Sequence, residues 1–258
     1  MSRTSCSDEE RFAVDVKTGY RRILAPILCA ASLPCVTARA PLVAIDIGHS
    51  KSNPGVMSAR GKPEFEFNRD LAEAIAQELA SRHVRSMSIG ADGTMEELPK
   101  RTAQAAMGGA TFFLSVHHDS AQERYLETWD WNGAGQRFTD RFSGFSLFVS
   151  RKNPRIEESL ACAHAIGTAL KAAGLAFSTH HAEGIAGEYR EWADRNAGVY
   201  YFDNLAVLKT ARTAAVLLEA GVIVNRADER TLQEPAMRRV IAGAVVRGLA
   251  ECGAIGRE

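Results

Sequence analysis

The stretch PLVAIDIGHSKSNPGVMSARGKPEFEFN, residues 41 to 68, decides the fold. It opens with a short aliphatic run over residues 42–45, which predicts a strand buried on both faces of a sheet. His49 follows just past the end of this strand, where open α/β sheets place their ligand sites. After a turn-rich loop, a helix is predicted to begin at Glu64. An imidazole and a carboxylate in these positions are two of the three protein ligands that a catalytic zinc needs.

The rest of the chain alternates predicted helices with predicted strands. Apolar residues recur every four positions over residues 67–79, which indicates an amphipathic helix packed on a sheet. A second buried strand, residues 110–116, runs straight into His117 and His118. Further strands are predicted at residues 145–150, 205–208 and 214–218, further helices at 98–107, 156–173 and about 232–252, and an irregular loop at 125–144. This order predicts a single α/β domain whose central, mostly parallel twisted sheet is flanked by helices on both faces.

The first forty residues have the pattern of a secretory signal peptide. Arg21 and Arg22 precede a short apolar run over residues 23–36, and Ala38-Arg39-Ala40 matches a cleavage site. We therefore expect residues 1–40 to be an export presequence. Residues 41–258 would then form a catalytic domain that is periplasmic or cell-wall associated and not held in a membrane. The alternative, a buried N-terminal helix, is disfavoured by two prolines inside the apolar run.

Charge and cysteine usage narrow the class of protein further. The formal net charge is zero and no basic stripe occurs, so nothing indicates a nucleic-acid partner. No uninterrupted apolar run reaches the length of a transmembrane helix. Cleavage after Ala40 would leave two of the five cysteines, Cys162 and Cys252, both within predicted helices. These two could pair or stay buried and reduced.

His49, Glu64 and His117 form a candidate zinc-binding set of two imidazoles and one carboxylate. Both histidines follow buried strands, and the carboxylate lies on the element after the first strand. Asp46 or Asp119 could hold the second nitrogen of an imidazole, as zinc-binding histidines usually require. Taken one at a time, each histidine is better explained as a partly exposed loop residue. The three together indicate a metal site that leaves one position for water.

Glu219 comes directly after the apolar residues 216–218, at the mouth of the predicted sheet. Poor solvation at this position would raise the pKa of its carboxyl group. Such a group suits a general base that takes a proton from water and later returns it to a leaving amine. The alternative is a glutamate at a strand end that forms a salt bridge with Arg101 or Arg226.

Together these residues resemble the zinc-dependent N-acetylmuramoyl-L-alanine amidases of the AmiC type. The family's I-D-x-G-H turn is seen at residues 45–49, and its glutamate four residues before an asparagine is seen as Glu64 and Asn68. Its S-[IV]-H-x-[DN] strand end is seen at residues 115–119, and its L-x-E strand end, followed by a hydrophobic turn and Asn, at residues 217–225. The resemblance covers nearly all of residues 42–252.

The resemblance implies one Zn²⁺ per chain, with His49, Glu64 and His117 as its ligands and Glu219 as the catalytic residue. It implies cleavage of the amide bond between the lactyl group of N-acetylmuramic acid and L-alanine of the peptidoglycan stem peptide. Two neighbours compete for the ligand positions. The spacing to Asn68 favours Glu64 over Glu66, and the register after Ser115 favours His117 over His118. Arg101 matches a family arginine with an expected structural role.

Residues 180–204 are longer than the corresponding segment of simple relatives. They could form an autoinhibitory or substrate-gripping lid, with His181, Glu183 or Glu188 reaching the site, and an inhibitory lid would require a protein activator. A surface loop with solvated charges is the alternative. Two other functions stay open at this point: a zinc peptidase that cuts within the stem peptide, and a catalytically silent wall-binding or regulatory relative.

Overall fold

The computed structural model describes residues 40–256. The predicted signal peptide therefore lies, apart from Ala40, outside the described residues. No helix within residues 40–256 combines the length and the apolar character that crossing a membrane requires.

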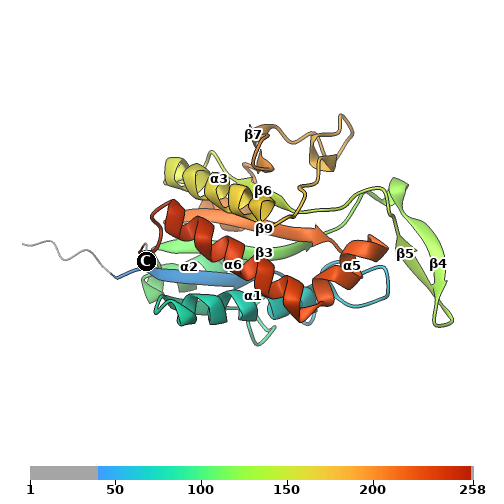
Figure 1. Ribbon diagram of the computed structural model, residues 1–258, viewed down its shortest axis with the longest axis horizontal. Coiled ribbons are helices and arrows are strands. Elements are labelled where there is room, and N and C mark those ends of the chain that lie inside the picture. Colours follow the sequence, from blue (N-terminus) through green and yellow to red (C-terminus); the bar gives the residue numbers. More distant parts are fainter. Residues whose placement is uncertain (1–39, 257–258) are drawn as a thin grey trace, which may run out of the picture. The chain divides into compact units, whose positions relative to one another are not determined.

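A seven-stranded sheet runs through the centre of the described residues, in the order β2-β1-β3-β9-β6-β8-β7 (Figure 1). The bounds of its strands are β1 Leu42–Ile47, β2 Arg85–Ile89, β3 Phe112–Asp119, β6 Ser146–Val149, β7 Trp192–Asp194, β8 Val199–Tyr201 and β9 Ala214–Val222. The four strands β2, β1, β3 and β9 are parallel, and β6 joins β9 in antiparallel orientation. The predicted mostly parallel sheet is therefore confirmed.

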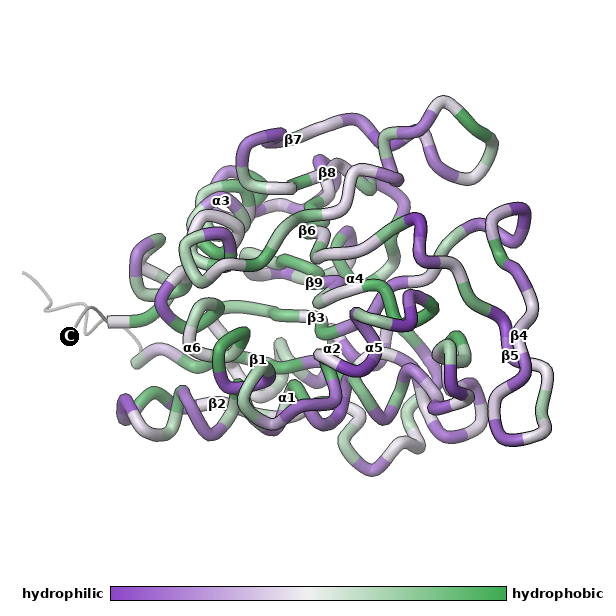
Figure 2. Tube along the Cα trace, turned by 45° about the vertical axis from the view of Figure 1, so that its right-hand side comes forward, coloured by the Kyte–Doolittle hydropathy of each residue, from purple (hydrophilic) through white to green (hydrophobic). Residues whose placement is uncertain are grey.

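Helices cover both faces of the sheet, as predicted. Their bounds are α1 Glu64–Ser81, α2 Leu98–Gly108, α3 Ile156–Ala172, α4 Ala206–Thr210, α5 Arg226–Gln233 and α6 Pro235–Glu251. Because successive strand residues point to opposite faces, Val43 and Ile45 pack in one core with α1, α3 and α6, whereas Ala44 packs in the other with α2 and α4. Hydrophobic residues accordingly gather along the central strands (Figure 2).

Residues 125–144 are not the irregular loop that their composition suggested. Strands β4 (Glu127–Trp131) and β5 (Ala134–Phe138) form an antiparallel hairpin that projects from the edge of the domain (Figure 1). Asn132 and Gly133 join the strands, and both have positive φ, 52° and 79°. An Asn-Gly pair with this backbone is the preferred two-residue hairpin turn, because its twist matches that of the strands.

One other element prediction is wrong. Residues 205–208 do not form a closing strand, since residues 206–210 form helix α4 instead. A four-residue apolar run cannot separate a strand from a buried helical turn, and Ala206, Leu208 and Lys209 favour the helix. The last helix, predicted at about residues 232–252, is confirmed as α6, which begins at Pro235, a favoured first residue of a helix. The preceding helix α5 was not predicted.

A disulfide bond joins Cys162 on α3 to Cys252, the residue after α6. The two cysteines are 90 residues apart in sequence. The pairing decides the alternative that the sequence left open, and it ties together two helices on the same face of the sheet.

Candidate metal centre and active site

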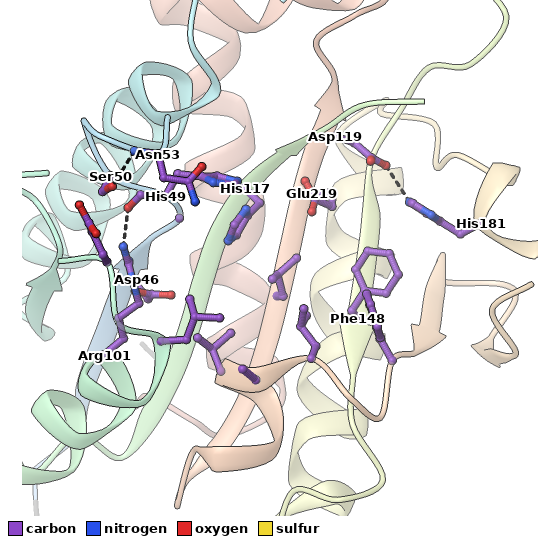
Figure 3. A pocket seen from close by; sticks show the side chains of 18 of the residues that line it. Asp46, His49, Ser50, Asn53, Arg101, His117, Asp119, Phe148, His181 and Glu219 are labelled. Atoms are coloured by element: carbon purple, nitrogen blue, oxygen red, sulfur yellow. Dashed lines mark hydrogen bonds and ion pairs between the residues drawn. The ribbon is translucent and has the colours of Figure 1, made fainter. Parts of the chain in front are cut away.

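Three of the predicted site residues lie toward the carboxyl ends of parallel strands, His49 after β1, His117 on β3 and Glu219 on β9, and the fourth, Glu64, begins α1. A cavity of about 540 Å³ opens there, and its wall includes His49, His117, Asp119, His181 and Glu219. His117 and Glu219 point into this cavity from neighbouring strands, and Asp119 and His181 lie beside them (Figure 3). Parallel strands bring their carboxyl ends to the same edge of a sheet, so the topology itself gathers these side chains.

Glu64 lies between two imidazoles. Its Oε2 is 2.9 Å from His49 Nε2 and its Oε1 is 3.0 Å from His117 Nδ1. Burial raises the pKa of the Glu64 carboxyl, but the hydrogen bonds and charges of His117 and His49 outweigh it and leave the pKa well below its usual range. Glu64 is therefore an anion in contact with two nitrogen donors, and all three donor atoms lie within 4.8 Å of one another.

The alternation of β3 separates the two competing histidines. His117 points to the same face as Glu219, whereas His118 points toward α1, where its Nδ1 lies 2.8 Å from Asn68 Oδ1. Burial lowers the pKa of His118 to about 3 and keeps it neutral. Asn68 also donates a hydrogen bond to Glu64 Oε1 at 3.0 Å. The structure thus brings Glu64 and His117 together and keeps His118 behind them as a buried support.

Arg101 holds the turn that carries His49. Its buried guanidinium donates to Asp46 Oδ1 at 2.8 Å, to the carbonyl oxygen of Ile47 at 2.5 Å and to that of His49. Ser115 donates to the other carboxylate oxygen of Asp46 at 2.7 Å. The expected structural role of Arg101 fits these contacts. Asp46 does not orient an imidazole, contrary to expectation, because Arg101 and Ser115 occupy both of its oxygens.

Two glycines leave the space that the cluster needs. A Cβ atom on Gly48 would lie 2.3 Å from His117 Nε2, and one on Gly55, which has φ +78°, would lie 2.4 Å from Glu64 Oε2. Both distances are too short for real contacts, so any side chain at either position would push a donor atom aside. Two imidazoles and a carboxylate, closely spaced and facing a cavity, fit the ligand set of a catalytic zinc site.

Glu219 lies within β9, directly opposite His117 in the strand register. Its Oε2 is buried and has no hydrogen-bond partner among residues 40–256. Burial, and then the negative charges of Asp119 and Glu64, raise the pKa of Glu219 well above its usual range. The alternative of a salt bridge is wrong, because Arg101 binds Asp46 and Arg226 binds Asp140.

Residues 180–204 are not only a surface loop, because they contribute to both the sheet and the cavity. Their second half contributes β7 and β8 to the sheet, and their first half forms one wall of the cavity. His181 and Glu188 line the cavity, as predicted, whereas Glu183 instead accepts a hydrogen bond from the Tyr125 hydroxyl at 2.9 Å. An activator protein stays a prediction.

Asp119 and the adjacent His180 and His181 form a second group of potential metal ligands. Asp119 Oδ2 lies 2.7 Å from His181 Nε2, so Asp119, like Asp46, orients none of the three residues of the first group. His180 was not among the residues predicted to reach the site. The His-His doublet was the available signal, but nothing in the sequence placed it near Asp119.

Comparison with known proteins identifies the family of this chain. The family model described as N-acetylmuramoyl-L-alanine amidase matches residues 43–251. The probable N-acetylmuramoyl-L-alanine amidase AmiB of Haemophilus influenzae is 23% identical in an alignment of 227 residues that covers 80% of this chain and 51% of that protein. The chain thus spans about half the length of this curated relative.

Solved structures show the same fold. The N-acetylmuramyl-L-alanine amidase Ami1 of Mycobacterium smegmatis superposes with a TM-score of 0.64 at 21% identity, covering 82% of this chain and 96% of that one. The catalytic domain of CwlV from Paenibacillus polymyxa superposes with a TM-score of 0.62 at 23% identity, covering 82% and 97%. Because the family model matches most of the sequence, the chain belongs to the N-acetylmuramoyl-L-alanine amidase family.

Proposed function

We propose that this chain is a zinc-dependent peptidoglycan amidase. It would hydrolyse the amide bond between the lactyl group of N-acetylmuramic acid and L-alanine of the stem peptide. One observation carries the proposal. His49, Glu64 and His117 converge at the edge of a cavity, and the unpartnered carboxyl group of Glu219 faces the same cavity from the next strand.

His49, Glu64 and His117 would hold the zinc, through His49 Nε2, the Glu64 carboxylate and His117 Nδ1. A zinc ion in such a site acts as a Lewis acid that polarises a carbonyl group and lowers the pKa of water to about 7. The low pKa of Glu64 keeps the carboxylate ready to bind a cation at neutral pH. Asn68 and Arg101 would keep the three donors in place, since the first binds Glu64 and the second binds the carbonyl oxygen of His49.

Glu219 would move the protons. Its carboxylate would take a proton from the attacking water and give it to the nitrogen of the leaving L-alanine. A carboxyl group whose pKa is raised by burial works near neutral pH in both directions, because it accepts a proton more readily than an ordinary glutamate and still releases it. The absence of a hydrogen-bond partner on Oε2 within the described residues leaves this oxygen available to water or substrate.

We also propose that the chain is exported and acts in the periplasm or at the cell wall. The substrate lies there, and the sequence of residues 1–40 has the pattern of a signal peptide. The Cys162–Cys252 disulfide supports this location, because such bonds form and persist in oxidising compartments.

Digestion of purified peptidoglycan by the zinc-loaded protein tests the proposed activity. Mass spectrometry of the products should show intact stem peptides that begin with a free L-alanine amine. Glu219→Ala should lose this release, and Glu66→Ala, a change two residues from Glu64 on the same helix, should keep it. Shorter peptides cut within the stem would instead identify a peptidase and contradict the proposal.

A further inference from the structure

A second cluster of two imidazoles and one carboxylate lies next to the proposed zinc site. Asp119 comes from β3, two residues after His117, and His180 and His181 come from the short helix η2 (His180–Ala182). Asp119 Oδ2 lies 2.7 Å from His181 Nε2 and 3.4 Å from His180 Nε2. One carboxylate oxygen of Asp119 thus faces the outer nitrogens of both imidazoles. The second cluster has the same composition as the first, two imidazoles and one carboxylate, and lies at a different part of the sheet edge.

His180 is the strongest sign that this cluster holds something. Its side chain is 2% exposed, and its Nε2 has no hydrogen-bond partner among residues 40–256. Its other nitrogen, Nδ1, lies 2.7 Å from Ser178 Oγ. If Nδ1 carries the ring proton and donates it to Ser178, the lone pair of Nε2 faces the carboxylate of Asp119. A cation bound between these two acceptors would satisfy both of them in this buried site.

His181 is oriented in the way that metal-binding histidines commonly are. Its Nδ1 lies 2.8 Å from Glu188 Oε2, which leaves Nε2 directed at Asp119. A carboxylate behind the inner nitrogen fixes the tautomer of the ring and makes the outer nitrogen a better donor. Each imidazole of the cluster therefore has its own support, Ser178 for His180 and Glu188 for His181.

We propose that Asp119, His180 and His181 form a second site for a divalent metal ion, of which zinc is the best match to the ligand types. Two neutral imidazoles and a carboxylate are borderline nitrogen and oxygen donors, which zinc binds in a tetrahedral arrangement with one further position. His181 and Asp119 line the cavity, so that position faces the space where substrate would bind.

The bound ion would connect β3 directly to η2, because Asp119 belongs to β3 and both histidines belong to η2. It would thereby fix the wall of the cavity that residues 178–190 build.

Zinc stoichiometry of the full chain tests this proposal without any reference to turnover. The chelator-treated protein is titrated with Zn²⁺, and bound zinc is measured by elemental analysis after removal of free metal. We expect two equivalents for the wild-type protein, one for His181→Ala and one for His49→Ala. Cobalt(II), whose visible absorption reports tetrahedral binding, should show the same loss of one equivalent in each variant.

Matched variants keep the result interpretable. His164→Ala removes an exposed histidine that pairs with Asp194 and should keep two equivalents. Asp119→Asn preserves the size of the side chain and serves in place of His181→Ala if that variant does not fold, and it too should keep one. Glu188→Gln should weaken only the second equivalent, by about 10–100-fold.

A wild-type protein that binds a single equivalent, lost in His49→Ala, would overturn the second site and leave the first intact. Two equivalents that persist in both His181→Ala and Asp119→Asn would place the second ion elsewhere and overturn the proposal as well. The proposed amidase activity is judged separately by its products, so neither result depends on it.

Discussion

The two clusters contain the same side-chain types but differ in what surrounds them. In the first cluster the side chains of His49 and His117 are 28% and 18% exposed and meet a carboxylate from a helix start. In the second, His180 and His181 are 2% and 10% exposed and meet a carboxylate from a strand. An open cluster leaves room for water and substrate beside a metal, whereas a closed cluster is better suited to fixing two segments together.

The supports behind the imidazoles differ as well. The first cluster is held mainly through the backbone, because Arg101 binds the carbonyl oxygens of Ile47 and His49 and close packing at Gly48 admits no side chain. The second is held by side chains, Ser178 and Glu188. If both clusters bind zinc as proposed, similar ligand sets would serve chemistry in one place and attachment in the other, and five variants test this difference.

Glu64→Ala should have the largest effect. Within residues 40–256, Glu64 is the only carboxylate that contacts both His49 and His117, so its loss leaves two imidazoles, too few to hold a zinc ion tightly. We expect stem-peptide release to fall to background and bound zinc to fall by one equivalent. Glu66→Ala is the control and should change neither. Release that survives in Glu64→Ala would show that the first cluster is not the catalytic one.

Glu219→Gln should lower kcat by about 10²–10⁴-fold, the usual contribution of a general acid–base group. Glutamine has the shape of glutamate but cannot take up a proton, and Glu219 binds neither cluster of imidazoles. Zinc content should therefore stay at the wild-type value. Steady-state release of stem peptide, measured beside elemental analysis of the same sample, provides the check. A variant that retains wild-type kcat would remove Glu219 from the mechanism.

Asn68→Ala and Glu188→Gln form a matched pair, one behind each cluster. Asn68 donates to Glu64 Oε1 and contacts His118, and Glu188 supports His181. Each change should weaken zinc binding about 10–100-fold at its own cluster only. Zinc titrations of the two variants give the two affinities separately. If either variant weakened both equivalents alike, the two clusters would be one coupled site.

Replacement of both Cys162 and Cys252 by alanine should affect stability and leave both clusters unchanged. Loss of a native disulfide costs roughly 2–5 kcal/mol of unfolding free energy, and a long loop such as this one of 90 residues lies toward the upper end of that range. Chemical denaturation measures the loss, and zinc stoichiometry should remain two. A lower stoichiometry would mean that the packing of α3 on α6 reaches the site.

Secondary structure was predicted most accurately for the strands that are buried on both faces. Strands β1, β3 and β9 are continuous apolar runs because helices cover both of their faces, and all three were predicted. The edge strand β2 was missed, since only Ile89 among its residues is buried and the alternation is weak. The β4–β5 hairpin was missed as well, although Asn132-Gly133 carried a turn signal that its polar surroundings obscured.

Some residues of the candidate site could likewise be predicted from the sequence, and others could not. His49, Glu64, His117 and Glu219 could be predicted, because each stands at a fixed place relative to a buried strand or a helix start. The partners of Asp46 and Asp119 could not be predicted, because they are distant in the sequence. Arg101 is 55 residues from Asp46, and His181 is 62 residues from Asp119. His180 has no periodic or spacing signal at all, and only the folded chain brings it to Asp119.

Zinc content and stem-peptide release, measured on the same samples of the wild-type protein, Glu64→Ala and Glu219→Gln, test the central claim most directly. The account predicts two equivalents with release for the wild type. It predicts one equivalent without release for Glu64→Ala, and two equivalents with release reduced at least 100-fold for Glu219→Gln. Release by Glu64→Ala, or none by a fully loaded wild-type protein, would contradict it.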